Sequence, residues 1–176
     1  MANAFVAVLV LAICHSTAQG VASATSHGIT APAVMPGTAA REFLDAHNQA
    51  RAEVRVGTLK WSEQLANATS RLARYQRNKM GCQIANLTGD KYGANQFWGG
   101  AARTPRMVVA SWVKEKSYYD YASNSCAPNY KCGLYTQVVW KNSSELGCAQ
   151  ATCKDRMTFT ICFYNPPGNY EGERPY

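Results

Sequence analysis

The chain has 176 residues and carries 18 lysine and arginine residues against 11 aspartate and glutamate residues, which gives a formal net charge of +7. No stretch reaches the roughly 20 apolar residues that a membrane-spanning helix needs, which excludes a transmembrane segment. The basic residues are scattered and form no nucleic-acid-binding motif, so nucleic acid is excluded as a partner. Acidic polysaccharide or anionic lipid could attract such a chain, but the scatter favours a solvated cationic surface.

An apolar run from Phe5 to Cys14 opens the chain and is followed by small residues suited to cleavage after Ala18 or Ala24. This pattern is typical of a secretory signal peptide, which we place at residues 1–24. Residues 25–38 indicate a linker, and its Ser, Thr, Gly and Pro residues disfavour the alternative of a hydrophobic first helix. We therefore expect a secreted, extracellular protein with one domain over residues 39–176.

Three amphipathic helices are predicted in the first part of this domain. The first runs from Ala39 to about Val54, with Thr38 as its cap and Gly57 after its end. Ser62 caps the second helix, which places on one face Leu65, Thr69, Leu72 and Ala73. Thr104 and Pro105 open the third, which carries Val108, Trp112 and Glu115.

Three strands are predicted after Cys132, over residues 134–140, 145–153 and 157–165, because these stretches are rich in β-branched and aromatic residues. Their short connections make them antiparallel neighbours. Helices followed by strands predict an α+β fold.

Removal of the signal peptide leaves an even set of cysteines, and an oxidising compartment predicts three disulfides among Cys82, Cys126, Cys132, Cys148, Cys153 and Cys162. Cys148 and Cys153 lie an odd number of positions apart on one strand, so they face opposite sides and cannot bond each other. In a hairpin that turns through residues 154–156, Cys148 lies opposite Cys162, within disulfide distance. Cys126 can close a small loop with Cys132, which leaves Cys82 for Cys153.

Sequons for N-glycosylation occur at Asn67, Asn86 and Asn142, and each occupied site must face solvent.

Several motifs together resemble the superfamily of cysteine-rich secretory proteins, antigen 5 and plant pathogenesis-related class 1 proteins: AHNQAR, GLYTQVVWKNSSELGC and CFYNPPGNYEGERPY. The stretches ANL, KYGANQFW and CGLYTQVVW are similar to the pistil-associated branch of the plant class. The resemblance covers about Ala39 to Tyr176 and implies a three-layer α-β-α sandwich with a central antiparallel sheet. It also implies a disulfide connectivity that agrees with the pairing above.

The family's central cleft typically holds two His and two Glu, a set that can bind a divalent metal. The matching positions here are Asn86, Ala94, Glu115 and Leu134, so only the glutamate at 115 survives. His27 lies in the linker, which leaves His47 as the one histidine of the domain, and its helical spacing with Phe43 suggests packing. We therefore expect no metal and no cofactor. A glycan on Asn86 would project from the cleft mouth; the alternative is a chance sequon that is never occupied.

We expect no catalytic residue and no enzymatic activity, because six bridged cysteines leave no thiolate for a nucleophile. The alternative is a hydrolase directed at polysaccharide that uses Glu115, but glycoside hydrolysis usually needs a second carboxylate roughly 5 to 9.5 Å away. The carboxylate of Glu115 is better explained as an acceptor for backbone groups or for Tyr135.

In the family, a loop after the third helix contributes to sterol binding, and the matching segment here offers Tyr118, Tyr119 and Tyr121 next to Lys114 and Lys116. Tyrosine rings suit a sterol with a polar tip. The alternative is that these tyrosines are packing residues. A sterol or lipid is therefore a candidate partner.

The last eleven residues, Pro166 to Tyr176, contain Pro and Gly that cannot sustain a sheet ladder, so they form either a packed extended arm or a segment available for cutting. Plant relatives can be cut ahead of a PxGNxxxxxPY ending, and this segment fits that pattern. Phe163 replaces an asparagine of the family's preceding CNYx motif. Release between Asn165 and Pro166 would involve a processing protease and a peptide receptor. The sequence thus predicts a monomeric, secreted, defence-related protein of reproductive or stressed tissue.

Overall fold

The computed structural model of the protein describes Met1, residues 37–87 and residues 91–176. The predicted signal peptide and most of the predicted linker lie outside the described residues. The chain divides into two units, Met1–Val34 and Met35–Tyr176. Every helix and strand described below lies in the second unit, and none of these helices has the length and apolar character to cross a membrane.

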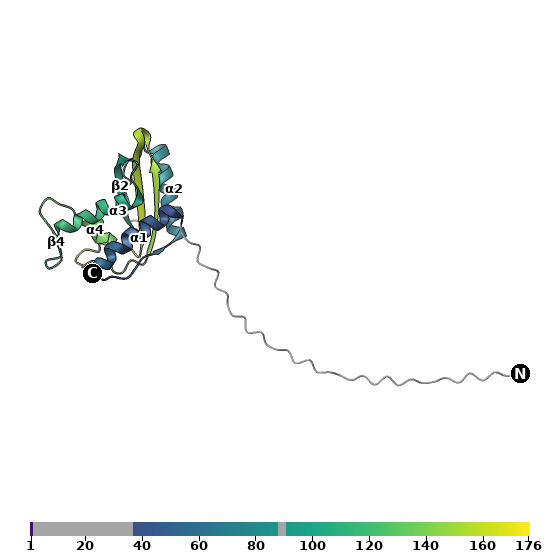
Figure 1. Ribbon diagram of the computed structural model, residues 1–176, viewed down its shortest axis with the longest axis horizontal. Coiled ribbons are helices and arrows are strands. Elements are labelled where there is room, and N and C mark those ends of the chain that lie inside the picture. Colours follow the sequence, from purple (N-terminus) through teal and green to yellow (C-terminus); the bar gives the residue numbers. More distant parts are fainter. Residues whose placement is uncertain (2–36, 88–90) are drawn as a thin grey trace. The chain divides into compact units, whose positions relative to one another are not determined.

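A sheet forms the centre of the second unit, as Figure 1 shows. It has four strands in the order β1-β5-β6-β2. β5 (Glu145–Thr152) and β6 (Met157–Asn165) form the predicted hairpin, which turns through the short 3-10 helix η2 (Lys154–Arg156). β2 (Gly93–Ala101) pairs with β6 in antiparallel orientation. β1 (Lys60–Trp61) pairs with β5 in parallel, because the segment after the first helix reaches the sheet edge in the direction of β5. The sheet is therefore mixed, which corrects the expectation of an antiparallel one.

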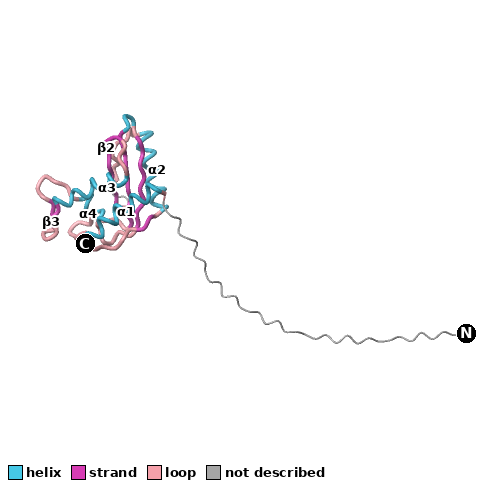
Figure 2. Tube along the Cα trace, viewed as in Figure 1, coloured by secondary structure: helices cyan, strands magenta, loops and turns pink. Residues whose placement is uncertain are grey.

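Helices cover both faces of this sheet, as Figure 2 shows. The side chains of β6 alternate between the two faces, as a strand requires. Cys162 and Tyr164 join a core with α1 (Thr38–Glu53), α3 (Pro105–Val113) and α4 (Gly133–Val138). Phe159, Ile161 and Phe163 join a second core with α2 (Glu63–Lys79). The predicted three-layer α-β-α sandwich is confirmed.

The predicted starts of the first three helices agree with the structure to within one residue. α1 begins at Thr38 with Gly37 as its cap, so Thr38 is the first helical residue rather than the cap. Ser62 occupies the cap position of α2 without a side-chain hydrogen bond. The Thr104 hydroxyl accepts a hydrogen bond from the Met107 backbone at 3.3 Å, which caps α3 ahead of Pro105.

The prediction of a strand over residues 134–140 is wrong, because this stretch contains helix α4. Tyr135, Val138 and Val139 are buried at helical spacing, against α1 and α3. Their side chains favour a strand in isolation, but tertiary packing decides the conformation. A second small sheet joins β3 (Tyr119–Asp120) to β4 (Ser125–Cys126), after the 3-10 helix η1 (Lys114–Tyr118).

Three disulfides join the cysteines in the predicted pairing. Cys148 and Cys162 lie directly opposite each other on β5 and β6, with a Cα separation of 4.0 Å. Cys126 and Cys132 close the loop that leads into α4. The bond from Cys82 to Cys153 joins the segment after α2 to the tip of the β5–β6 hairpin, so it ties the helical layer to the sheet.

Candidate functional site

The four positions of the family's cleft lie on or next to β2, η1 and α4. Glu115 of η1 is half-buried, and its Oε2 accepts hydrogen bonds from the backbone N–H groups of Leu134 at 2.8 Å and Tyr135 at 3.2 Å. The Leu134 carbonyl in turn accepts from the side chain of Asn95 on β2, at 2.9 Å. Glu115 therefore caps the first turn of α4, as a carboxylate does at a helix N-terminus. In the described part of the chain, no three His, Cys, Asp or Glu side chains gather as a candidate metal site.

Asn86 lies in the segment between α2 and β2 and is exposed. Its neighbour Ala85 is held to β2, because the side-chain amide of Gln96 bonds both the backbone N–H of Ala85 at 2.8 Å and its carbonyl at 2.9 Å. The other two sequon asparagines, Asn67 on α2 and Asn142 before β5, are exposed as well. All three therefore meet the requirement that a glycan must face solvent.

His47 is completely buried between α1 and β6. Its Nδ1 donates to the Phe43 carbonyl at 2.7 Å, so its Nε2 accepts from the hydroxyl of Tyr164 at 2.8 Å. Burial is the main cause that lowers the pKa of His47 to about 4, against the hydrogen bond to Phe43, which raises it. The imidazole is neutral at ordinary pH and has both nitrogens occupied. It packs the core, and no serine or cysteine lies against it among these bonds.

Arg51 is a buried cation at the end of α1, and its exposed fraction is only 1%. It donates to four backbone carbonyls, three of which belong to the end of α4 and the turn beyond it: Gly57 at 2.7 Å, Val138 at 3.1 Å, Trp140 at 2.8 Å and Ser143 at 3.0 Å. Burial lowers its pKa to about 10, so the guanidinium stays charged. Arg51 thereby fixes residues 139–144, which we call the α4–β5 turn.

The α4–β5 turn and α4 hold the start of the C-terminal arm, residues 166–176. The Ser143 hydroxyl donates to the Pro166 carbonyl at 2.8 Å. The buried side chain of Gln137 accepts from the backbone N–H of Gly168 at 3.1 Å. Gly168 lies so close to α4 that a Cβ atom there would stand 2.5 Å from Cγ of Trp140. The arm therefore needs glycine at 168 because its backbone touches the Trp140 ring.

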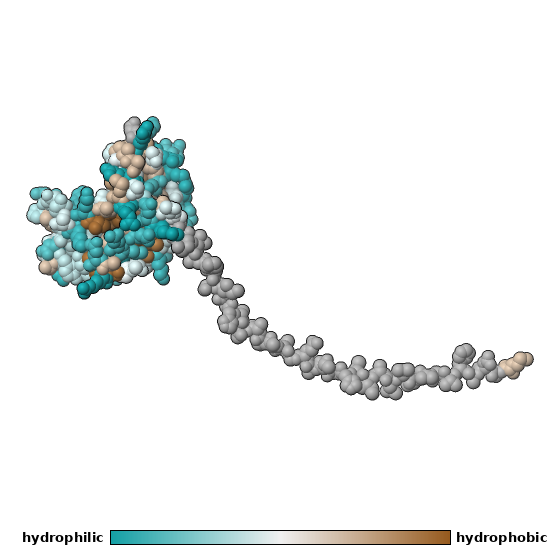
Figure 3. Space-filling view, in the orientation of Figure 1, coloured by the Kyte–Doolittle hydropathy of each residue, from teal (hydrophilic) through white to brown (hydrophobic). Residues whose placement is uncertain are grey.

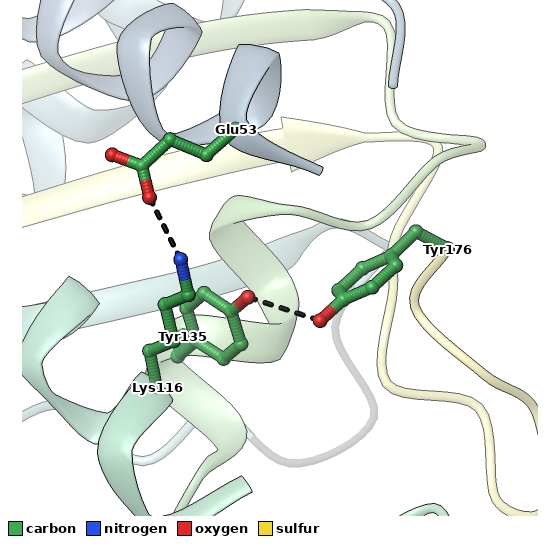
Figure 4. A network of polar contacts seen from close by, with 4 residues as sticks. All are labelled: Glu53, Lys116, Tyr135 and Tyr176. Atoms are coloured by element: carbon green, nitrogen blue, oxygen red, sulfur yellow. Dashed lines mark hydrogen bonds and ion pairs between the residues drawn. The ribbon is translucent and has the colours of Figure 1, made fainter. Parts of the chain in front are cut away.

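The end of the arm is held separately, by the same turn and by the loop around β3. The backbone N–H of Lys141 donates to the Pro175 carbonyl at 2.7 Å, and Pro175 is buried. The hydroxyls of Tyr135 and Tyr176 lie 3.2 Å apart, as Figure 4 shows. Tyr121 stacks on the Tyr176 ring with centroids 4.8 Å apart, and its hydroxyl donates to the Tyr176 main-chain oxygen at 2.7 Å. Both ends of the arm are thus anchored. Residues 169–174 between them are exposed, but they also bond the domain: the Asn169 side chain bonds α4, and the Glu173 carbonyl and the Arg174 side chain bond the loop around β3.

A cavity of about 330 Å³ lies between this exposed middle of the arm and the Cys126–Cys132 loop. Its lining mixes aromatic and polar side chains, among them Tyr119, Asn124, Thr136, Trp140, Asn169 and Glu173. The arm is one wall of the cavity, so the cavity exists only while the arm is in place.

The three tyrosines proposed to bind lipid have different partners. Tyr118 stacks on Tyr130 with centroids 3.7 Å apart. Tyr119 is half-buried and lies edge-on to Tyr176, at 6.5 Å between centroids. The ring of Tyr121 stacks on that of Tyr176, as described above. The structure therefore brings Tyr119 and Tyr121 to the arm, while Tyr118 lies in a separate stack that leaves 38% of its surface exposed.

A narrow apolar groove of about 140 Å³ runs between α1 and α3, with Ala46, Ala50, Val109 and Val113 among its lining residues. Figure 3 shows hydrophobic side chains gathered where these helices meet. Glu53 lines this groove, and its carboxylate pairs with the Lys116 ammonium of η1 at 2.8 Å (Figure 4). Lys116 and Val113 also line an open hollow beside Tyr118. The groove therefore leads toward the loop that was expected to bind sterol.

Sequence reasoning missed Arg51, Gln137 and Ser143, the residues that hold the turn and the arm. Arg51 stands four positions after His47 and eight after Phe43, on the buried face of α1. A cation on the apolar face of a predicted helix was the sequence signal that could have revealed its role. Gln137 and Ser143 lie within the motif that carried the family resemblance, but the strand expected there would have pointed them elsewhere.

The sequence profile of the cysteine-rich secretory protein family (CAP) matches residues 44–164, and the chain belongs to that family. Plant pathogenesis-related proteins of class 1 are among the relatives found, as predicted. The chain is 61% identical over 140 residues to the STS14 protein of Solanum tuberosum, a match that covers 78% of this chain and 65% of that relative, less than two thirds of its length. It is 45% identical over 141 residues to pathogenesis-related protein 1A of Nicotiana tabacum, with 77% and 80% covered.

Solved structures support the same fold. Venom allergen-like protein 4 of Schistosoma mansoni superimposes with a TM-score of 0.65 at 22% identity, over 80% of this chain and 95% of that one.

Proposed function

We propose that this protein acts in extracellular plant defence as the precursor of a peptide, residues 166–176, which is released by cleavage between Asn165 and Pro166. One observation carries the proposal: every helix, strand and disulfide of the described residues lies before Pro166. A cut there would therefore leave a complete sandwich and free a segment held only by non-covalent contacts.

The contacts around the cleavage point also predict how release is controlled. The Asn165 carbonyl accepts from the backbone N–H of Ser144 at 3.0 Å, and the Asn165 side chain donates to Glu145 at 2.6 Å. A protease must draw the bond out of these contacts, so cutting requires local opening at the end of β6. Release would be slow in the resting protein and faster under conditions that loosen the turn.

The test is mass spectrometry of the protein from its native apoplast, before and after pathogen challenge. A chain that ends at Asn165, together with free PPGNYEGERPY, is the expected result. A chain that ends at Tyr176 in every sample would overturn the proposal and leave the folded domain as the agent of defence.

A second candidate function is the capture of a sterol or other lipid, favoured by the apolar groove between α1 and α3. Its small and branched side chains form an apolar floor, and charged groups stand at its rim, including Glu53 and Arg106. Such a lining suits a flat or elongated apolar molecule with a polar tip. The tyrosine loop would then contribute through Tyr118 and the exposed part of Tyr121, whose exposed fractions are 38% and 42%. Tyr119 is half-buried and contacts the arm.

Titration with a fluorescent sterol tests this second function. Ala50→Phe would fill the groove and abolish saturable binding, whereas Ala149→Phe on β5, outside the groove, is a matched control. Equal binding by the wild-type protein and by an unrelated basic secreted protein would remove lipid capture from consideration.

The alternative of a polysaccharide hydrolase depends on Glu115. Its carboxylate already accepts two backbone hydrogen bonds, and this supports a capping role. The wild-type protein and Glu115→Gln can be compared on a panel of polysaccharides. Turnover by the wild type that the substitution abolishes would favour the hydrolase function.

A further inference from the structure

The sequon at Asn142 lies within the α4–β5 turn, next to the anchors of the C-terminal arm. Asn142 is exposed, and its side chain makes no hydrogen bond with the part of the chain that the structure describes. A glycan could therefore be attached without displacing a contact. Its two neighbours in the sequon, Ser143 and Ser144, point instead to the arm and to the residue before it.

Residues 141–144 contact both ends of the arm within four consecutive positions. Lys141 binds the carbonyl of Pro175, at the arm's end, and Ser143 binds that of Pro166, at its start. Ser144 binds the carbonyl of Asn165 through its backbone N–H at 3.0 Å and through its hydroxyl at 3.3 Å. That carbonyl belongs to the peptide bond between Asn165 and Pro166, so the sequon residues contact the bond whose cleavage would release the arm.

The turn that carries Asn142 is held firmly. Arg51 binds the carbonyls of Trp140 and Ser143, on both sides of Asn142, from inside the core. Hydrogen bonds from a buried charged group are stronger than neutral ones. A glycan on this turn would therefore have a constant point of attachment beside the anchors of the arm.

We propose that an N-glycan on Asn142 shields the arm and the Asn165–Pro166 bond from proteases. A branched, hydrated glycan occupies the space through which a protease must approach, and here it would be attached one residue from both Lys141 and Ser143. If the glycan controls peptide release by shielding the Asn165–Pro166 bond, that part of the proposal rests on the function proposed above. The shielding of the arm itself is independent of that function. Glycan occupancy would thus divide the protein into a protected form and a releasable form.

The sequon at Asn67 provides a matched comparison. Asn67 is also exposed, but it lies on α2, in the helical layer on the other face of the sheet from α4. A glycan there would add the same bulk and solubility without covering the arm. A difference between the two sites therefore reports on position and not on glycosylation as such.

The experiment uses the full chain secreted from plant cells as wild type, Asn142→Gln and Asn67→Gln, with occupancy determined by peptide mass spectrometry. Each protein is exposed to chymotrypsin, for which Tyr170 in the middle of the arm is a half-exposed site, and separately to apoplastic fluid. Wild type trimmed with endoglycosidase to a single sugar serves as a second measurement, because it keeps the asparagine and the turn intact.

We expect chymotrypsin to cut after Tyr170 several-fold faster in Asn142→Gln and in the trimmed protein than in wild type or Asn67→Gln. The apoplastic fluid should release PPGNYEGERPY in the same order. An unoccupied Asn142 in the wild-type protein, or equal chymotrypsin rates in all four samples, would overturn the shielding. A chymotrypsin difference without any release of the peptide would uphold the shielding of the arm and sink the proposed release.

Discussion

A neutral imidazole in the interior makes this protein sensitive to acid at His47. The pKa of His47 is about 4 in the folded state against 6.5 for an ordinary histidine. Between these two pH values the unfolded chain binds a proton on His47, whereas the folded protein keeps His47 neutral. Stability from this residue is complete above pH 6.5 and is lost as the pH falls toward 4. The difference between the two pKa values corresponds to about 3 kcal/mol.

Urea unfolding of the wild type and of His47→Gln at pH 7 and at pH 4.5 measures this contribution. The wild type should lose more stability between the two pH values than the variant, which lacks the titrating group. Identical losses would mean that carboxylates alone account for the acid sensitivity.

The buried cation Arg51 makes a second prediction at the residue scale. Arg51→Met removes the donor to four carbonyls, three of them at the end of α4 and in the α4–β5 turn, and leaves acceptors without partners. We expect a loss of about 3 kcal/mol in the free energy of unfolding. Arg41→Met, on the exposed face of the same helix, should change it by less than about 0.5 kcal/mol. A similar small effect at both positions would show that water replaces the guanidinium in the turn.

Gly168 makes a third prediction, about the arm. An alanine Cβ there would stand 2.5 Å from Cγ of Trp140 and 2.8 Å from Nε2 of Gln137, so the arm must lift from α4. Chymotrypsin should then cut Gly168→Ala after Tyr170 faster than wild type, while the far-ultraviolet circular dichroism, which reports the helices and strands of the domain, stays unchanged. Gly57→Ala, where a Cβ meets nothing within 4 Å, is the control. An unaltered cutting rate in Gly168→Ala would argue that the arm moves freely in solution.

Among the elements, the sequence predicted those whose pattern is local. α1, α2 and α3 show helical spacing and recognisable caps, and the β5–β6 hairpin shows alternation around a short turn. The disulfides followed from that hairpin, because strand parity decides which cysteines can meet. The candidate role of Glu115 as a backbone acceptor was likewise predictable, because the sequence assigns it no partner carboxylate for hydrolysis.

Two elements depend on contacts distant in sequence and were not predicted. β2 contains four residues of low strand propensity, Gly93, Gly99, Gly100 and Asn95, and it becomes a strand through its pairing with β6. α4 is short and rich in residues that favour strands, and it becomes a helix through Glu115 at its start and its buried face against α1 and α3. The anchors of the arm were missed for the same reason, since Gln137 and Ser143 belong to α4 and to the turn that follows it.

For the whole molecule, the position of the last disulfide predicts that the domain survives loss of the arm. A chain that ends at Asn165 keeps both cores and all three bridges. We expect it to fold with one cooperative thermal transition, at a lower Tm than the full chain because Trp140 and Tyr135 lose their cover. Calorimetry of the two chains, with intact mass to count the bridges, checks this. A shortened chain without a cooperative transition would make the arm part of the folding unit and not a detachable segment.

The bonds around Asn165 have a chemical consequence after a cut. Hydrolysis would convert its neutral carbonyl, now bound by Ser144, into a carboxylate within reach of the Glu145 side chain, and like charges that close repel each other. The cut also leaves a protonated amine on Pro166, and once the arm carries that positive charge away, the new end of the chain would tend to turn away from β5. Local electrostatics would thus make the separation directional.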